Sequence, residues 1–349
     1  MDEKQSRVIN LLRYPLAVLV VMCHSCFLDG GGTAVQIFFS EVLPHVAVPL
    51  FLLFSGYLFF KEGKFDSSLY RHKLKSRFHT LFIPYIIWST LCFIIAAMRG
   101  QVTPTFAHYI QGLWDTELWK DGVTFSRTLP GYPMNMPLWF VRDLMILVVI
   151  SPIIWFLLRK TNGWGILLLG AWWFPSHDKF FGFGADSLFF FSLGALLSLK
   201  NVNFVQIARK YSVPLYSATG VMLVADYWVM YNNYMAYHEL RFNWPLFNVY
   251  VLCIMGATIA LAGKLEERSF AERLIKLSQA SFFLYAAHIL WLEPLRDALL
   301  HALSPSSEAL VVIFYFCFIA FHCWAVTSLF FLMRRYLPKT MSVVTGGRV

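Results

Sequence analysis

The stretch that decides the fold reads Arg13-Tyr-Pro-Leu-Ala-Val-Leu-Val-Val-Met-Cys-His24. It is almost wholly apolar, with a cation at one end and a titratable imidazole at the other. On an α-helix the two ends are about three turns plus 20° apart, so both side chains lie on one face, about 16 Å apart along the axis. Ionisable residues inside a membrane helix are candidates for function. The stretch therefore predicts a membrane span with a polar stripe.

The composition of the whole chain is typical of a membrane protein. Of the 349 residues, 58% are hydrophobic and only 14% are charged, whereas soluble domains carry about 25% charged residues. The net charge is +9, but the basic residues lie in short loops between apolar runs, so we expect no nucleic-acid partner. The six cysteines all lie in apolar segments and predict no disulfide framework.

Ten apolar segments predict about ten transmembrane helices in one all-α, membrane-embedded domain that covers residues 1–349. The charged N-terminus runs into the first segment without a small-residue cleavage site, so this span is expected to be retained. An even number of spans puts both termini on one side. The segments are 8–28, 44–60, 78–98, 137–158, 162–175, 183–199, 211–231, 244–263, 278–298 and 308–333.

The distribution of basic residues sets the orientation. On the side of the termini lie 21 Lys and Arg residues, and the opposite loops hold five. Positive charge concentrates on the cytoplasmic side of membrane proteins. Both termini are therefore predicted to be cytoplasmic, in a multi-pass protein of the inner (cytoplasmic) membrane.

The longest loop, about 99–136, faces the far side and is rich in Gly, Pro and Trp. A long loop without a clear helix or strand pattern is uncommon unless it is functional or disordered. Its aromatic side chains would suit stacking on sugar rings, and an interfacial aromatic belt explains them equally well.

Two segments near the cytoplasmic side carry further polar residues. Ser55 precedes Gly56 in the second span, where the hydroxyl is available as a donor and the glycine allows close helix packing. The segment from Arg71 through Lys73 to Arg77 is basic and precedes the third span. Such a segment binds anionic membrane lipid or a phosphorylated ligand, and the sequence leaves both open.

Later spans add a second group of polar residues. Trp139 begins a span at the far interface, beside an Arg142–Asp143 pair whose members can neutralise each other. Tyr285 and His288 are three residues apart and share a helix face. Glu293 follows in the same span, where an isolated carboxylate needs a partner or water.

Several other site types are not supported. Cys23-His24-Ser25-Cys26 contains metal-binding residue types, but it has neither the scaffold of a redox pair nor the spacing of a haem attachment site. No phosphate-binding loop, dinucleotide fingerprint or zinc-protease helix is present. We expect no metal site.

Taken together, these segments resemble the membrane-bound acyltransferase family 3, the bacterial group that O-acylates surface and secreted carbohydrates. The resemblance runs from the first span to the ninth, with two departures. The family often has a second arginine three residues after the position of Arg77, where this chain has Thr80, and many relatives carry a hydrolase-like domain after the spans, so a stand-alone member is expected. The matching motifs are Arg13 to His24, Phe54-Ser55-Gly56-Tyr57, Leu138-Trp139-Phe140 and Tyr285-Ala-Ala-His288.

The resemblance implies transfer of an acyl group, with acetyl expected, from cytoplasmic acyl-CoA to a hydroxyl of a glycan or lipid-linked saccharide. Arg13 would bind the phosphates of the donor, together with Arg71, Lys73 and Arg77. Ser55 would donate a hydrogen bond to the thioester oxygen or simply pack. The reaction needs no metal.

His24 would act either as the general base for the attacking hydroxyl or as a covalent acyl carrier between the two sides. Two carboxylates are candidates to orient its imidazole, Asp29 and Glu293, although Asp29 falls off the His24 face of a helix. The residues expected to contact the acceptor are Trp139, Tyr285 and His288.

A different class of function also fits the polar residues. In a secondary transporter or flippase, Arg13, His24 and Glu293 would form a polar pathway through the bundle. Transporters of this kind often show inverted repeats and broken helices in matching positions, and the sequence contains neither.

Overall fold

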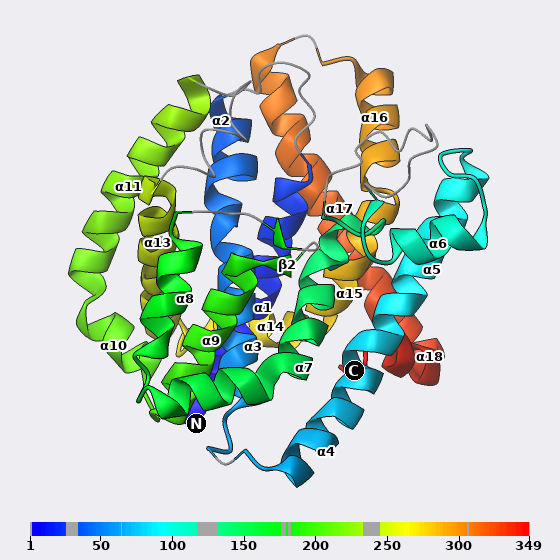
Figure 1. Cartoon of the computed structure of the whole chain (residues 1–349). Coiled ribbons are helices and arrows are strands. Elements are labelled where there is room, and N and C mark those ends of the chain that lie inside the picture. Colours follow the sequence, from blue (N-terminus) through cyan, green and yellow to red (C-terminus); the bar gives the residue numbers. More distant parts are fainter. Residues whose placement is uncertain are drawn as a thin grey trace.

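A computed structural model describes residues 2–25, 34–63, 65–116, 131–175, 179–180, 183–232, 245–305 and 307–348. Nearly all of these residues are helical, and the helices form one bundle (Figure 1). The strands of the described part are two residues long and pair antiparallel, β1 (Lys179–Phe180) with β2 (Phe183–Gly184). The predicted all-α class is confirmed.

Helix α1 (Glu3–Cys23) contains the stretch that opens the sequence analysis. It begins after Asp2, whose backbone N–H donates to the Gln5 side chain at 3.1 Å, an interaction that satisfies one of the free amides of a helix start. Along its length α1 contacts α3 (Ala47–Phe59), α13 (Pro245–Leu265), α15 (Ser281–Ala287) and α17 (Glu308–Tyr336). The helix that carries Arg13 and ends directly before His24 is therefore enclosed by other helices.

The second span is one continuous, irregular rod over residues 34–59. It consists of α2 (Ala34–Ile37), the π-helical η1 (Phe38–Val42), the 3-10 helix η2 (Leu43–Val46) and α3. Gly56 of α3 and Gly194 of α9 (Ala185–Leu199) let these two helices pack backbone against backbone. A Cβ on Gly56 would lie 2.0 Å from the Phe191 carbonyl oxygen, and one on Gly194 equally close to that of Leu53.

The remaining elements complete the bundle. Between the second span and α9 lie α4 (Ser67–Arg77), η3 (Phe78–Phe82), α5 (Ile83–Met98), α6 (Phe106–Gly112), η5 (Met136–Leu138), α7 (Trp139–Lys160) and α8 (Gly165–Trp173). After α9 come α10 (Phe204–Lys210), α11 (Ser212–Asn232), α13, α14 (Ser269–Leu277), η7 (Ser278–Ala280), α15, η8 (His288–Leu290), α16 (Leu292–Leu303), α17 and α18 (Pro338–Val344).

Each of the ten predicted spans contains helix, but the count of ten crossings is not confirmed. Within the described residues, six helical rods are long and apolar enough to cross a membrane, or seven if α9 and α10, bent by 99°, form one span. Helix α8 has only nine residues, about 14 Å against a hydrocarbon core of about 30 Å. The ninth predicted span is divided into η7, α15, η8 and α16.

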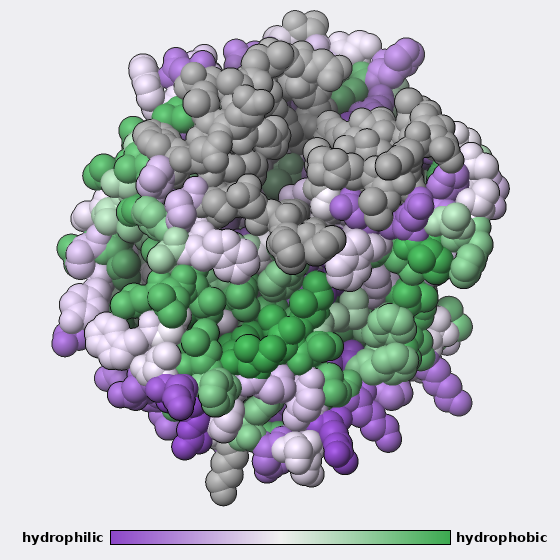
Figure 2. All heavy atoms as spheres, viewed as in Figure 1, coloured by the Kyte–Doolittle hydropathy of each residue, from purple (hydrophilic) through white to green (hydrophobic). Residues whose placement is uncertain are grey.

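The two chain ends lie in the lower part of the molecule in Figure 1, together with α4, α10 and α18. Hydrophobic residues form a band across the middle of the face seen in Figure 2, and hydrophilic residues gather below it. This distribution is that of a membrane protein with a hydrophilic end beside both termini.

We predict that Gly56→Ala lowers stability by about 1–3 kcal/mol, because the new methyl group forces a backbone shift in a close-packed contact. The apparent melting temperature of the purified protein in detergent measures the effect. Gly220→Ala is the matched control, since a Cβ at this helical glycine meets no atom within 4 Å. Equal melting temperatures for the Gly56 variant and the wild type would contradict the proposed contact.

Candidate functional site

A cavity of about 370 Å³ opens between α1, α3, α7 and α15, and α4 and the chain after α18 close its side. Three arginines reach it from different elements: Arg13 from α1, Arg77 from the end of α4 and Arg348 from beyond α18. Its polar wall includes Ser55 of α3. The rest of the wall is formed mainly by Phe51, Leu58, Phe59, Leu81, Phe140, Leu144, Val148, Phe191, Ser278, Gln279, Ser281, Phe282 and Tyr285.

The three guanidinium groups are close enough to repel one another. Burial, together with the charges of Arg77 and Arg13, lowers the pKa of Arg348 to about 9. Among the residues that the structure describes, no carboxylate lines the cavity, and neither Arg13 nor Arg77 forms a hydrogen bond or ion pair. A cluster of arginines without a counter-ion is suited to bind a multiply charged anion such as a group of phosphates.

The sequence analysis missed Arg348, which is brought to the cavity by a specific turn. The Trp88 indole donates to the Val344 carbonyl at 2.9 Å and holds the end of α18 against α5. Gly346 then adopts φ +64° and packs against the Thr80 backbone, where a Cβ would come within 2.4 Å of the carbonyl oxygen. The Arg348 guanidinium lies 4.4 Å from the Phe282 ring. The glycine pair before Arg348 is the only sequence signal for this turn.

Thr80 occupies the position at which the resembling family often has an arginine, and the structure brings another arginine close by. The turn that packs on Thr80 continues directly into Arg348, which lines the cavity. The C-terminal segment therefore supplies the cavity with a positive charge, which position 80 does not carry in this chain.

Two of the predicted donor-binding residues do not line the cavity. Lys73 donates to the Phe59 carbonyl and pairs with Glu62 at 3.5 Å. Its ammonium also lies 4.9 Å from the Phe59 ring, so Lys73 supports the cavity wall from behind. Arg71 is exposed on α4. Of the five residues predicted for this role, the structure brings together Arg13, Ser55 and Arg77.

A series of ring contacts connects the cavity wall with His24. Tyr285 lines the cavity, and its hydroxyl donates to the Pro137 carbonyl. The ring of His288, one turn further, lies 6.4 Å from the Tyr285 ring and 5.3 Å from the His24 ring, measured between centroids. His24 does not line the cavity itself. It lies next to His288, and helix geometry puts it about 16 Å from Arg13 along the axis of α1.

The other predicted site residues lie away from the cavity. Glu293 belongs to the first turn of α16. Trp139 is the first residue of α7, and its ring lies 6.1 Å from that of Tyr132. Neither side chain lines the cavity. Asp29 lies outside the described residues.

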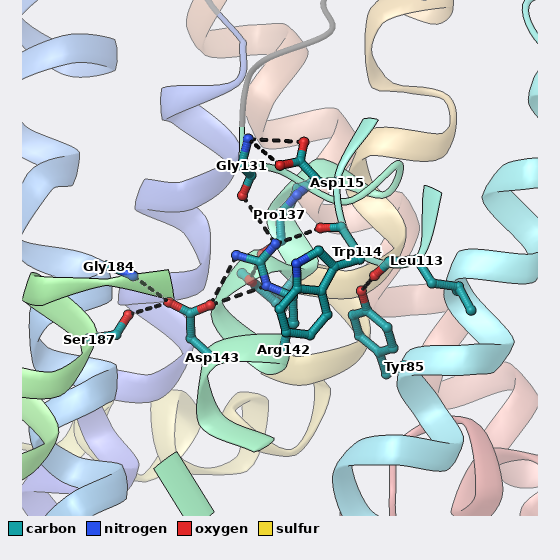
Figure 3. A network of polar contacts seen from close by, with 11 residues as sticks. Tyr85, Leu113, Trp114, Asp115, Gly131, Pro137, Arg142, Asp143, Gly184 and Ser187 are labelled. Atoms are coloured by element: carbon teal, nitrogen blue, oxygen red, sulfur yellow. Dashed lines mark hydrogen bonds and ion pairs between the residues drawn. The ribbon is translucent and has the colours of Figure 1, made fainter. Parts of the chain in front are cut away.

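The Arg142–Asp143 pair near the start of α7 forms an ion pair and also bonds to other segments of the chain (Figure 3). Both side chains are buried, and the Arg142 Nη2 lies 3.1 Å from the Asp143 Oδ1. Arg142 also donates to the Trp114 and Gly131 carbonyls at 2.6 and 3.1 Å. The second Asp143 oxygen accepts from the Ser187 hydroxyl at 2.7 Å. The pair thus joins α7 to the start of α9 and to both ends of the stretch between residues 114 and 131.

We predict that Arg142→Ala destabilises the protein by about 3–5 kcal/mol, because it leaves the Asp143 carboxylate buried without its cation. The double variant R142M/D143L removes both charges and should recover part of this loss. Thermal unfolding in detergent measures all three proteins. A wild-type melting temperature for Arg142→Ala would show that the pair does not hold these segments.

Comparison with known proteins gives two matches. A family model described as an acyltransferase domain matches residues 7–328. The succinoglycan biosynthesis protein ExoH of Rhizobium meliloti (strain 1021) is 25% identical over 362 residues, an alignment that covers 100% of this chain and 94% of that protein. No solved structure matches the chain significantly.

Proposed function

The chain belongs to the acyltransferase family whose domain model covers residues 7–328, and from this premise we propose that it transfers an acyl group from cytoplasmic acyl-CoA to a hydroxyl of a cell-surface or secreted glycan. Acetyl is the proposed group, and the inner membrane the proposed location. The observation that carries the proposal is the cluster of three arginines in a cavity whose wall residue Tyr285 is connected to His24 through the ring of His288.

The donor fits the charge of the cavity. Coenzyme A carries a diphosphate and a further phosphate, and guanidinium groups bind phosphates through paired, charge-assisted hydrogen bonds. In our proposal Arg13, Arg77 and Arg348 hold these phosphates. The pantetheine arm then follows the wall formed by α3 and α15, past Ser55, toward Tyr285. Ser55 is placed to donate a hydrogen bond to this arm or to the thioester.

The chemistry is assigned to His24. As general base it accepts the proton of the acceptor hydroxyl while the hydroxyl oxygen attacks the thioester carbonyl carbon. The carbon–sulfur bond then breaks, and the imidazolium returns the proton to the leaving thiolate. In the competing version, His24 first takes the acyl group from sulfur and then passes it to the hydroxyl. Asp29 and Glu293 remain candidates to orient the ring in either version.

The acceptor is proposed to be a glycan or lipid-linked saccharide that approaches from the side opposite the termini. The name of the relative ExoH connects that protein to the biosynthesis of a polysaccharide, which supports a saccharide acceptor here. Trp139, at the start of α7, is the proposed aromatic contact for a sugar ring. Tyr285 and His288 lie between the donor cavity and His24, where the two substrates would meet.

We predict that His24→Ala abolishes glycan acylation in cells while protein level and acetyl-CoA binding are retained, because the side chain acts in the chemical step. Mass spectrometry of surface glycans from a deletion strain, complemented with either form of the gene, measures the loss of the acyl mass. Full acylation with His24→Ala would contradict the assignment. If the transporter alternative were correct, glycan acylation would be the same with and without the gene.

We predict that Arg348→Ala weakens acetyl-CoA binding about 10- to 100-fold, because it removes a charge-assisted contact of about 1.5–3 kcal/mol. Titration calorimetry with the purified protein in nanodiscs measures the dissociation constant. Arg335→Ala is the matched control, since Arg335 is exposed and lies outside the cavity. Equal affinities for both variants would exclude Arg348 from donor binding.

A further inference from the structure

His288 is the most enclosed imidazole near the proposed site of transfer. Its side chain is fully buried, at 0% exposure. Its Nδ1 lies 2.8 Å from the Tyr285 carbonyl oxygen. Since a carbonyl oxygen only accepts hydrogen bonds, the proton of this contact belongs to Nδ1.

The other ring nitrogen of His288 has no hydrogen-bond partner among the described residues. If the ring were charged, Nε2 would be a buried N–H donor without an acceptor, which is a costly arrangement. The contacts therefore favour the neutral tautomer with the proton on Nδ1. This tautomer leaves a lone pair on Nε2, so His288 can accept a hydrogen bond.

The acceptor nitrogen of His288 lies beside the proposed catalytic base. The His24 and His288 rings are 5.3 Å apart between centroids and tilted by 35°, so the two imidazoles are direct neighbours. His322 of α17 is a second buried histidine, and its Nε2 also has no hydrogen-bond partner among the described residues. Helix α15 and the short η8 thus place His288 between His24 and the cavity residue Tyr285.

We propose that His288 is a positioning residue for His24: when the substrates bind, the neighbouring His24 ring turns so that one of its nitrogens donates a hydrogen bond to the free Nε2 of His288, which keeps the other His24 nitrogen unprotonated and directed toward the reacting groups. The proposal rests on the proposed function, in which His24 is the base. A neutral imidazole in this role avoids the cost of burying a carboxylate in the membrane. When His24 accepts the proton of the hydroxyl, the same hydrogen bond stabilises the imidazolium until the thiolate takes the proton.

Two substitutions at position 288 separate this role from simple packing. His288→Asn keeps an amide N–H where Nδ1 donates to the Tyr285 carbonyl, but it has no acceptor at the Nε2 position. The longer side chain of His288→Gln can place its amide oxygen at that position. His322→Asn is the matched control, because it is the same change at a second buried histidine, on a different helix.

The assay uses membrane vesicles from cells that produce the glycan, with acetyl-CoA as the donor and release of free thiol as the readout. We expect His288→Asn to lower the maximal rate about 100-fold, within the range attributed to general-base catalysis, with the KM for acetyl-CoA changed less than about twofold. His288→Gln should recover at least about tenfold of this loss, and His322→Asn should keep the maximal rate per folded protein.

The outcomes distinguish the two proposals. If His24→Ala is inactive, three results would each overturn the positioning role alone. These are a wild-type maximal rate for His288→Asn, no recovery with His288→Gln, and an equal loss of rate with His322→Asn. An active His24→Ala, or no thiol release by the wild type, would overturn the proposed function and the positioning role with it.

Discussion

The constraint on which the rest of the site depends is the mutual repulsion of three arginines in one cavity. Arg13, Arg77 and Arg348 come from a central helix, a surface helix and the C-terminal segment, and none of the described residues that line the space between them is a carboxylate. Such an arrangement is unfavourable without an anion, because partly buried charges repel strongly. The cluster is therefore suited to bind a polyanion, and the phosphates of the proposed acyl-CoA donor are such a group.

A single rigid helix relates this anion site to the proposed site of transfer. Arg13 lies within α1 and His24 directly follows its last residue, Cys23, so their separation is set by helix geometry. The segment beside α1 supplies a parallel series of contacts: Gln279 and Tyr285 line the cavity, and His288 reaches His24. This segment is broken into short helices, an arrangement found in membrane proteins where backbone lines a cavity, and its polar residues Ser278, Gln279 and Ser281 line the cavity.

The sequence predicted what depends on local pattern, and it failed where distant segments meet. Periodicity and charge were enough for the all-α class, whereas the functional stripe from Arg13 to His24 stays a prediction, because of the two only Arg13 lines the cavity. The number of crossings was not predictable, because the short α8 and the break near His288 depend on neighbouring helices rather than on apolar length. On α4, the sequence could not decide which of several basic residues faces inward. The position of Arg348 at the cavity could not be predicted, because it depends on a turn packed against Thr80.

The most direct test is a cryo-EM structure of the protein with acetyl-CoA bound, because it shows whether the arginine cavity is the donor site. The expected result has the phosphates within hydrogen-bonding distance of Arg13, Arg77 and Arg348, and the thioester beyond Ser55 near His24 and His288. Phosphates bound elsewhere, or a thioester that points away from His24, would contradict the assignment of both ends of α1.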